Sequence, residues 1–319
     1  MNRLFLLLLL ISKISFGQEL SIEKKEFDKI YAELDNTNKW GKEDYIGTIN
    51  YITEDKILSS LKIPERGISV SLSFNLTGDS SKLNSSKFDE LSKFNYEPLA
   101  LDFKGYNWII DEYKFSYHGF THSHMDGLSH LSNNGIYYNS HTKPENLGVE
   151  NYSKGIISKG ILIDIPLLKS KEFIESGYKI SIDDILEFEK KFNIEIEKGD
   201  ILLIRTGRWK EKEINGDWDF PNKSAGLHYK VMTLLGERKI SVLGSDGTND
   251  SNPPLIKEEG SPIHKIALVA MGMPLLDNLN LEDLSKKCKE LNQWEFLLSI
   301  QPLKFEGGTG SPVNSIAIF

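Results

Sequence analysis

The chain has 319 residues, a formal charge of −8 and an ordinary composition, with 39% hydrophobic and 26% charged residues. This length suits one large domain or two moderate ones, and the composition excludes collagen-like, disulfide-dense and disordered chains. The acidic balance argues against nucleic acid as a partner, because non-specific binding to phosphates needs a basic surface. The single cysteine, Cys288, excludes an intramolecular disulfide and every thiolate-rich metal site.

The first seventeen residues have the pattern of a secretory signal. Arg3 supplies the positive start, residues 4–11 are an unbroken apolar run, and Ser15 and Gly17 are small residues at the positions that a signal peptidase favours. The run is too short to span a bilayer, and an uncleaved amphipathic anchor is the alternative. We therefore expect an exported protein, periplasmic or secreted, without a membrane span, whose mature chain starts near Gln18. A lead-in over residues 18–39 then precedes one domain over residues 40–319.

Apolar runs closed by turn residues alternate with amphipathic stretches along the rest of the chain. Strands are predicted at residues 68–74, 160–166, 200–207 and 240–246. Helices are predicted at residues 20–34, 182–192, 228–238 and 281–291. Ser181 is the expected N-cap of the second of these helices, and residues 78–92 indicate a surface loop or insertion. The alternation is typical of an α/β fold, and no linker is long enough to divide it.

Five of the seven histidines fall within 24 residues, namely His118, His122, His124, His130 and His141. If the segment is extended, residues two apart share a face, and His118, His122, His124, Asp126 and His130 all point one way. Several imidazoles and a carboxylate are costly to bury together without a partner, and a divalent cation is the natural one. Nitrogen and oxygen ligands suit zinc, manganese or iron(II). A polar surface strand, or a hydrogen-bonded loop around Asp126, is the alternative.

A site with these ligands is expected to keep one coordination position open for water, as catalytic metal sites do. A bound metal lowers the pKa of that water and makes hydroxide available as a nucleophile. A histidine that is not a ligand could move the protons, and His130, four residues past Asp126, is the best candidate for that role.

The stretch His124-Met-Asp126-Gly-Leu-Ser-His130 matches the second half of a family signature, His-x-x-x-His-x-Asp-x-x-x-His. Further segments that are similar, in the same order, lie at residues 40–50, 203–207, 226–246, 271–279 and 308–314. From about Trp40 to Phe319 the chain therefore resembles the cyclase family of metal-dependent hydrolases, which includes the bacterial kynurenine formamidases and isatin hydrolase.

The resemblance implies an α/β fold with a swivelling β/β/α core in a homo-oligomer, usually a dimer or tetramer. It implies a centre of one or two metals, zinc or manganese, and hydrolysis of an amide, lactam or formamide bond by metal-bound water. On the matched positions, His124 and Asp126 would be ligands and His130 the proton shuttle.

The chain departs from the family pattern in two places. Phe120 stands where the first ligand belongs, so either His118 or His122 takes over, or both join His124 in a shifted ligand set. Asp277 stands where formamidases carry Glu as a late ligand, and its shorter reach brings the metal closer or weakens a second metal site. His264 lies roughly where the family has another ligand.

Two residues at strand ends are candidates for binding substrate. Arg205 could hold a substrate carboxylate, or pair with a neighbouring acid. Asp246 and Asp250 flank a polar turn after a buried strand, a place where sites of α/β proteins lie, although a solvated turn is the alternative. Trp108 and Tyr117, which precede the histidines, could line an aromatic pocket or pack in the core.

Together these features predict an exported metal-dependent hydrolase that attacks an amide- or lactone-type carbonyl of a small molecule. Two alternatives remain from other classes. One is a non-catalytic periplasmic metal-binding protein, and the other is a dehydratase-like lyase on the same scaffold.

Overall fold

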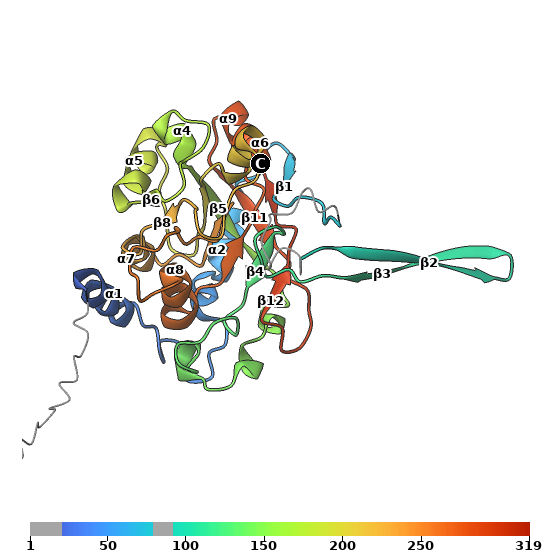
Figure 1. Ribbon diagram of the computed structural model, residues 1–319, viewed down its shortest axis with the longest axis horizontal. Helices are drawn as coiled ribbons and strands as arrows, with labels where there is room; N and C mark the ends of the chain where they lie inside the picture. Colours follow the sequence, from blue (N-terminus) through green and yellow to red (C-terminus); the bar gives the residue numbers. More distant parts are fainter. Residues whose placement is uncertain (1–20, 79–91) are drawn as a thin grey trace, which may run out of the picture.

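A mixed sheet of nine strands is the centre of the structure, a computed structural model that describes residues 21–78 and 92–319 (Figure 1). Across the sheet the strands are β1 (Ser69–Ser71), β13 (Ile316–Ile318), β11 (Glu295–Ile300), β5 (Ile156–Asp164), β7 (Ile201–Arg205), β9 (Val242–Ser245), β10 (Leu275–Asp277), β4 (His124–Asp126) and β12 (Gly310–Pro312). The four strands β5, β7, β9 and β10 pair in parallel, and the strands on either side of them pair antiparallel. The carboxyl ends of the parallel strands therefore meet at one edge, where the candidate site lies.

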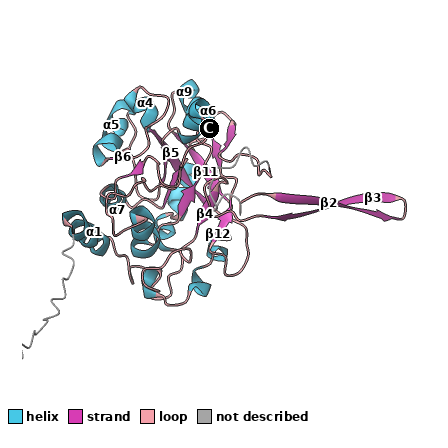
Figure 2. Cartoon of the chain, in the orientation of Figure 1, coloured by secondary structure: helices cyan, strands magenta, loops and turns pink. Residues whose placement is uncertain are grey.

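Helices surround this sheet (Figure 2). The α-helices are α1 (Ile22–Glu33), α2 (Glu54–Ser60), α4 (Ile165–Lys169), α5 (Ile182–Phe192), α6 (Arg208–Asn215), α7 (Val231–Arg238), α8 (Pro262–His264) and α9 (Glu282–Leu291). Short 3₁₀ segments are η1 (Gly47–Tyr51), η3 (Tyr138–Ser140), η4 (Pro144–Leu147) and η5 (Val149–Tyr152), and η6 (Lys265–Met271) is a π-helix. A second, two-stranded sheet pairs β6 (Lys179–Ile180) with β8 (Gly226–Leu227).

The local sequence explains why α5 begins and ends where it does. The Ser181 hydroxyl accepts a hydrogen bond from the backbone N–H of Asp184, and the Asp184 carboxylate accepts one from the backbone N–H of Ser181. This reciprocal capping box satisfies two N–H groups that the first turn of a helix leaves unpaired. The buried face carries Ile185 and Phe188, and the helix ends at Asn193, which has left-handed backbone geometry. The predicted N-cap is thus confirmed.

The predicted α/β alternation is confirmed as well. The apolar runs form β5, β7 and β9, whose residues are almost all buried because helices or neighbouring strands cover both faces. The four predicted helices correspond to α1, α5, α7 and α9, and the first predicted strand to β1. The predicted leader, residues 1–17, and most of the predicted insertion lie outside the described residues. Within the described ranges, no helix combines the length and apolarity needed to cross a membrane.

One of the elements that were not predicted is a hairpin. Strands β2 (Asn95–Phe103) and β3 (Tyr106–Lys114) pair antiparallel and form a hairpin that extends away from the rest of the molecule (Figure 1). The turn between them, Lys104 and Gly105, has φ values of 51° and 80°. Two successive residues with positive φ are typical of the two-residue turn that suits the twist of a hairpin.

Candidate metal centre

Strand pairing places three side chains of the site. β4 carries His124 and Asp126, which share one face because they lie two residues apart. β4 pairs antiparallel with β10, and the register sets His124 directly opposite Asp277. All three residues are buried, with at most 2% of each exposed. Two carboxylates and an imidazole are therefore held together where little water reaches them.

Two further imidazoles reach Asp126 from the segments on either side of β4. Nδ1 of His118 lies 3.0 Å from Oδ1 of Asp126, and Nε2 of His130 lies 3.9 Å from Oδ2. The two imidazole rings are stacked, with centroids 4.1 Å apart. A hydrogen bond of 3.0 Å from the backbone N–H of His130 to the carbonyl of Gly127 closes the turn after β4. Because the chain turns before and after β4, both histidines converge on one carboxylate.

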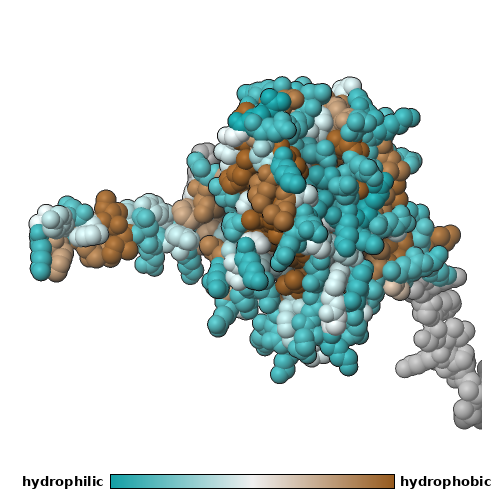
Figure 3. Space-filling view, turned by 180° about the vertical axis from the view of Figure 1, so that it is seen from behind, coloured by the Kyte–Doolittle hydropathy of each residue, from teal (hydrophilic) through white to brown (hydrophobic). Residues whose placement is uncertain are grey.

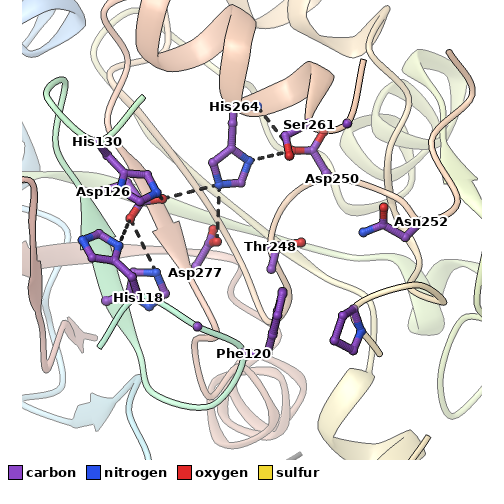
Figure 4. A pocket seen from close by; sticks show the side chains of 14 residues that line it. His118, Phe120, Asp126, His130, Thr248, Asp250, Asn252, Ser261, His264 and Asp277 are labelled. Atoms are coloured by element: carbon purple, nitrogen blue, oxygen red, sulfur yellow. Dashed lines mark hydrogen bonds and ion pairs between the residues drawn. The ribbon is translucent and has the colours of Figure 1, made fainter. Parts of the chain in front are cut away.

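His264 completes the cluster from the C-terminal part of the chain. Its Nε2 lies 3.4 Å from Oδ2 of Asp126 and 3.6 Å from Oδ2 of Asp277. Asp250, in the turn after β9, accepts a 2.7 Å hydrogen bond from the backbone N–H of Ile263 and lies 2.6 Å from Nδ1 of His264. Figure 4 shows His264 between Asp250 on one side and the pair Asp126 and Asp277 on the other. Asp250 thus holds both the backbone of α8 and the side chain of His264 in place.

Three of the imidazoles each use one nitrogen for orientation and turn the other toward the acidic cluster. The orienting contacts are those of His118 with the Thr309 hydroxyl (3.2 Å), His124 with the His122 carbonyl (2.8 Å) and His264 with Asp250 (2.6 Å). Asp277 is oriented in the same way, because Asn249 donates a 2.7 Å hydrogen bond to its Oδ1 and leaves Oδ2 toward His264. Such a supporting contact on the far side of each donor is typical of metal ligands.

The cluster shifts the pKa values of its members. Burial raises the pKa of Asp126, but the surrounding imidazoles, His130 first, outweigh it and hold that pKa well below its usual range. Burial lowers the pKa of His130 to about 4, which leaves this ring neutral at neutral pH. Burial would also lower the pKa of His264, but the three carboxylates around it raise that pKa well above its ordinary value. His264 therefore lies in an excess of negative charge that favours a cation.

The donor set fits a metal. Nδ1 of His118 and Oδ1 of Asp126 are buried and, although close, neither makes a hydrogen bond of good geometry to a described residue. Buried polar atoms are seldom left in this state, and a cation between them would satisfy both. Two groups of ligand atoms each lie within 4.8 Å, namely His118, Asp126 and His130, and His124, Asp126 and Asp277. Because Asp126 belongs to both groups, the site could hold one cation or two neighbouring ones.

The cluster forms one wall of a pocket of about 320 Å³ (Figure 4). The remaining wall is mixed in character and includes Phe120, Thr248, Asn252 and Ser261. Ligand pockets commonly measure roughly 300–1,000 Å³, so this one suits a small molecule.

Comparison with known proteins identifies the family of this chain. Residues 35–249, about two thirds of the chain, match the model of the Cyclase family, described as "Putative cyclase". The chain belongs to the Cyclase family. The match includes all the candidate residues from His118 to His130 and ends before His264 and Asp277. The comparison with curated proteins gave no match.

Solved structures show the Cyclase fold along most of the chain. A crystal structure described as a novel cyclase is 26% identical, with a TM-score of 0.79 over 91% of this chain and 99% of that one. Isatin hydrolase A from Labrenzia aggregata is 21% identical, with a TM-score of 0.58 over 78% of this chain and 93% of that one. A protein described as a predicted metal-dependent hydrolase from Bacillus stearothermophilus is 15% identical, with a TM-score of 0.50 over 79% and 98%. These structures confirm the predicted cyclase-like α/β fold.

His118 and His122 were the two candidates for the first ligand of the Cyclase family, where this chain has Phe120. The structure brings His118 to the acidic cluster. His122 points elsewhere, because its Nε2 lies 2.9 Å from the carbonyl of Ser92 and its ring packs edge-on against Phe115. The five side chains were expected to point one way only if the segment is extended, but just His124–Asp126 is a strand, so alternation applies only there and His122 does not join the others. The chain before β4 bends, so His118 and His122 leave it in different directions.

The two predicted substrate residues lie outside the pocket of this Cyclase chain. The Arg205 guanidinium, 4% exposed, binds Asp164 at 2.9 Å and Glu282 at 2.7 Å. Asp246 is fully buried and accepts hydrogen bonds from the backbone N–H groups of Thr206 and of the two residues that follow it. Both residues therefore hold strand ends together, which was the alternative interpretation for Arg205.

Sequence reasoning missed several contributors to the site. Asp250 was noted only as part of a polar turn, and its contact with His264 spans fourteen residues. Thr309 lies in a Gly-Gly-Thr-Gly segment, residues 307–310, and a Cβ on the neighbouring Gly310 would lie 2.6 Å from Cε1 of His118. The sequence held a signal for each residue, because Asp250 follows a buried strand and Thr309 lies in a glycine-rich turn. Neither position reveals which histidine it supports.

Proposed function

We propose that this Cyclase-family chain is a metal-dependent hydrolase that cleaves an amide, formamide, lactam or lactone bond of a small molecule. The observation that carries the proposal is the set of imidazoles oriented toward Asp126, each by a hydrogen bond on its far nitrogen. Similar folds occur in proteins described as isatin hydrolases and as metal-dependent hydrolases, which supports the same assignment.

Zinc or manganese is the proposed cofactor, because imidazole nitrogen and carboxylate oxygen suit both metals. His118, His124, Asp126, Asp277 and His264 would hold it. When bound, such a cation polarises a carbonyl oxygen and lowers the pKa of a water molecule toward neutrality.

His130 is proposed to move the proton. Its side chain is 30% exposed on the pocket wall, whereas His124 and Asp126 are almost fully buried. Because the ring is neutral at neutral pH, its free nitrogen can accept a proton and deliver it to the leaving group. Stacking on His118 fixes the plane of the ring, so the nitrogen is aimed before substrate arrives. The bound molecule would lie between His130 and the wall formed by Phe120 and Thr248.

The test uses the purified chain, stripped by a chelator, on an aryl formamide, a lactam and a lactone. Turnover is expected to disappear on stripping and to return with Zn²⁺ or Mn²⁺. Turnover that is unaffected by the chelator would overturn the proposal. Elimination products in place of hydrolysis products would identify a lyase instead.

The matched variant is His130→Ala, with metal content measured by elemental analysis. The group His124, Asp126 and Asp277 is intact in this variant, so at least one cation should remain bound while turnover falls by about 10²–10⁴-fold. A metal-binding protein without catalysis would show a loaded site and no turnover even in the unchanged chain.

A further inference from the structure

The pocket beside the candidate metal centre has two ends of different character. One end is the cluster around Asp126, with His118 and His130. Figure 4 shows Thr248 and Asn252 across the pocket from these residues. Because the oriented imidazoles and the proposed proton carrier are at the first end, the bond that is cleaved must lie there. The rest of the substrate therefore contacts the opposite side, the far wall.

The far wall offers apolar surface and hydrogen bonds without charge. It consists of Phe120, Pro221, Thr248, Asn252 and Ser261. Two rings, two hydroxyls and one amide are thus available, and none of these groups is charged at neutral pH. Among the residues that the structure describes, no lysine or arginine lines any part of the pocket. The far wall therefore suits uncharged groups.

The apolar part of the far wall is held in place from behind. The Phe120 ring packs against Phe220, with centroids 6.0 Å apart, and the Phe120 carbonyl accepts a hydrogen bond from Arg208. Pro221 follows Phe220 directly in the chain. Figure 3 shows the hairpin of β2 and β3 standing clear of the body, and none of its residues lines the pocket. The body of the molecule therefore shapes the far wall before a substrate binds.

Basic side chains of the surrounding segments are engaged elsewhere or lie outside the pocket. Lys265 binds Glu259 at 2.9 Å, and Lys223 is exposed and is not part of the lining. Arg205, which the sequence suggested for a substrate carboxylate, is buried in its ion pairs. A carboxylate at the far wall would therefore meet none of these cations.

The charges that do line the pocket are negative. Asp126, Asp250 and Asp277 are each at most 3% exposed. The metal centre, when occupied, offsets part of this charge at its own end only. A carboxylate or phosphate at the far wall would lose water without gaining a partner cation, and such burial of an unpaired charge is costly. The pocket therefore discriminates against anions at this position.

We propose that the substrate of this site is uncharged away from the cleaved bond. An apolar ring lies against Phe120 and Pro221, and neutral polar groups face Thr248, Asn252 and Ser261. Molecules with a carboxylate or phosphate at that end are rejected. The inference rests on the proposed function, because it names the substrate class of the same site.

The test compares two ligands of nearly the same shape, 4-carbamoylbenzohydroxamate, which is neutral at its far end, and 4-carboxybenzohydroxamate, which is anionic there. A hydroxamate binds Zn²⁺ through its two oxygens, so both ligands are anchored alike in the Zn²⁺-loaded chain. Isothermal titration calorimetry measures the two dissociation constants, and elemental analysis measures the zinc content. The carbamoyl ligand is expected to bind at least about tenfold more tightly, because only the carboxylate loses hydration without a partner.

Two variants assign this preference to the far wall. Ser261→Arg supplies a guanidinium at the exposed edge of the pocket, so it should remove most of the difference between the two ligands. Ser59→Arg is the matched control, because it makes the same substitution at an exposed position of α2 that does not line the pocket. It changes the total charge equally and should leave the ratio of the two affinities unchanged.

Equal affinities of the two ligands for the loaded chain would overturn this inference and leave the proposed function standing. A ratio that Ser261→Arg does not alter, or that Ser59→Arg alters as much, would overturn it as well. A chain that takes up no Zn²⁺ and binds neither ligand would instead overturn the proposed function, and the inference with it.

Discussion

Replacement of Asp250 by Asn tests whether the acid behind His264 serves the metal centre. Asp250 lies 2.6 Å from Nδ1 of His264, and its other oxygen accepts from the backbone N–H of Ile263. In Asp250→Asn the carbonyl oxygen can keep the backbone contact, which places the amide NH₂ against Nδ1. Since two donors repel, the His264 proton should move to Nε2, the nitrogen that faces Asp126 and Asp277. That nitrogen could then no longer bind a cation.

The expected loss of metal affinity is that of a single disabled ligand. Only the imidazole of His264 is affected, while His118 and His124 keep their own supports. Removal of such a support weakens metal binding by about 10–100-fold, which equals roughly 1.4–2.7 kcal/mol of binding free energy. The measurement is a competition titration of Zn²⁺ or Mn²⁺ against a chelator of known affinity, with the unchanged chain beside the variant.

Asp217→Asn is the matched control, because Asp217 is partly exposed and pairs with Lys212 on the surface. It should bind metal as the unchanged chain does. The melting temperature of the metal-free Asp250→Asn chain checks that the fold is intact. A folded Asp250→Asn chain with unchanged metal affinity would refute the role of Asp250, and with it the reasoning from oriented imidazoles.

Other parts of the molecule offer four further tests. Arg205→Met should lower the free energy of unfolding in urea by about 3–5 kcal/mol, since it leaves a buried acid unpaired, and a neutral result would contradict the ion-pair role. Gly310→Ala should push His118 out of place and cost about 1–3 kcal/mol, measured as weaker metal binding and a lower melting temperature. Burial raises the pKa of Glu211 from 4.5 to about 7, so the folded chain holds an extra proton between these values and loses stability as the pH rises from about 4.5 to about 7; Glu211→Gln should therefore melt higher at about pH 8 but not at about pH 4. If residues 1–17 act as the proposed export signal, the intact mass of the exported chain should correspond to a start at Gln18.

The parts of the fold that were predicted correctly rest on local signals. The apolar runs of β5, β7 and β9 are buried on both faces, so composition alone marks them. The start of α5 is encoded by Ser181 and Asp184, three residues apart. The β2–β3 hairpin was missed because its turn, Lys104 and Gly105, is not one of the residue pairs that mark a hairpin, and because its exposed strands have no buried face that would impose a regular alternation.

The site was predictable only in part for a related reason. His124 and Asp126 follow from two-residue alternation in a real strand. His118 and His122 both lie an even number of residues before His124, and only the bend before β4 decides that His118 faces Asp126. The support of His264 by Asp250 is a tertiary contact, which no local pattern encodes.

Asp126 is proposed as the shared ligand of the metal centre, and every other role in the site depends on it. The most direct measurement is a crystal structure of the chain prepared with Zn²⁺ or Mn²⁺, with anomalous differences recorded at the absorption edge of the metal. We expect one peak or two adjacent peaks, each about 2.0–2.2 Å from an oxygen of Asp126, with His118 or His124 nitrogens at similar distances. A metal bound away from Asp126, or no peak in this pocket at saturating metal, would contradict the assignment.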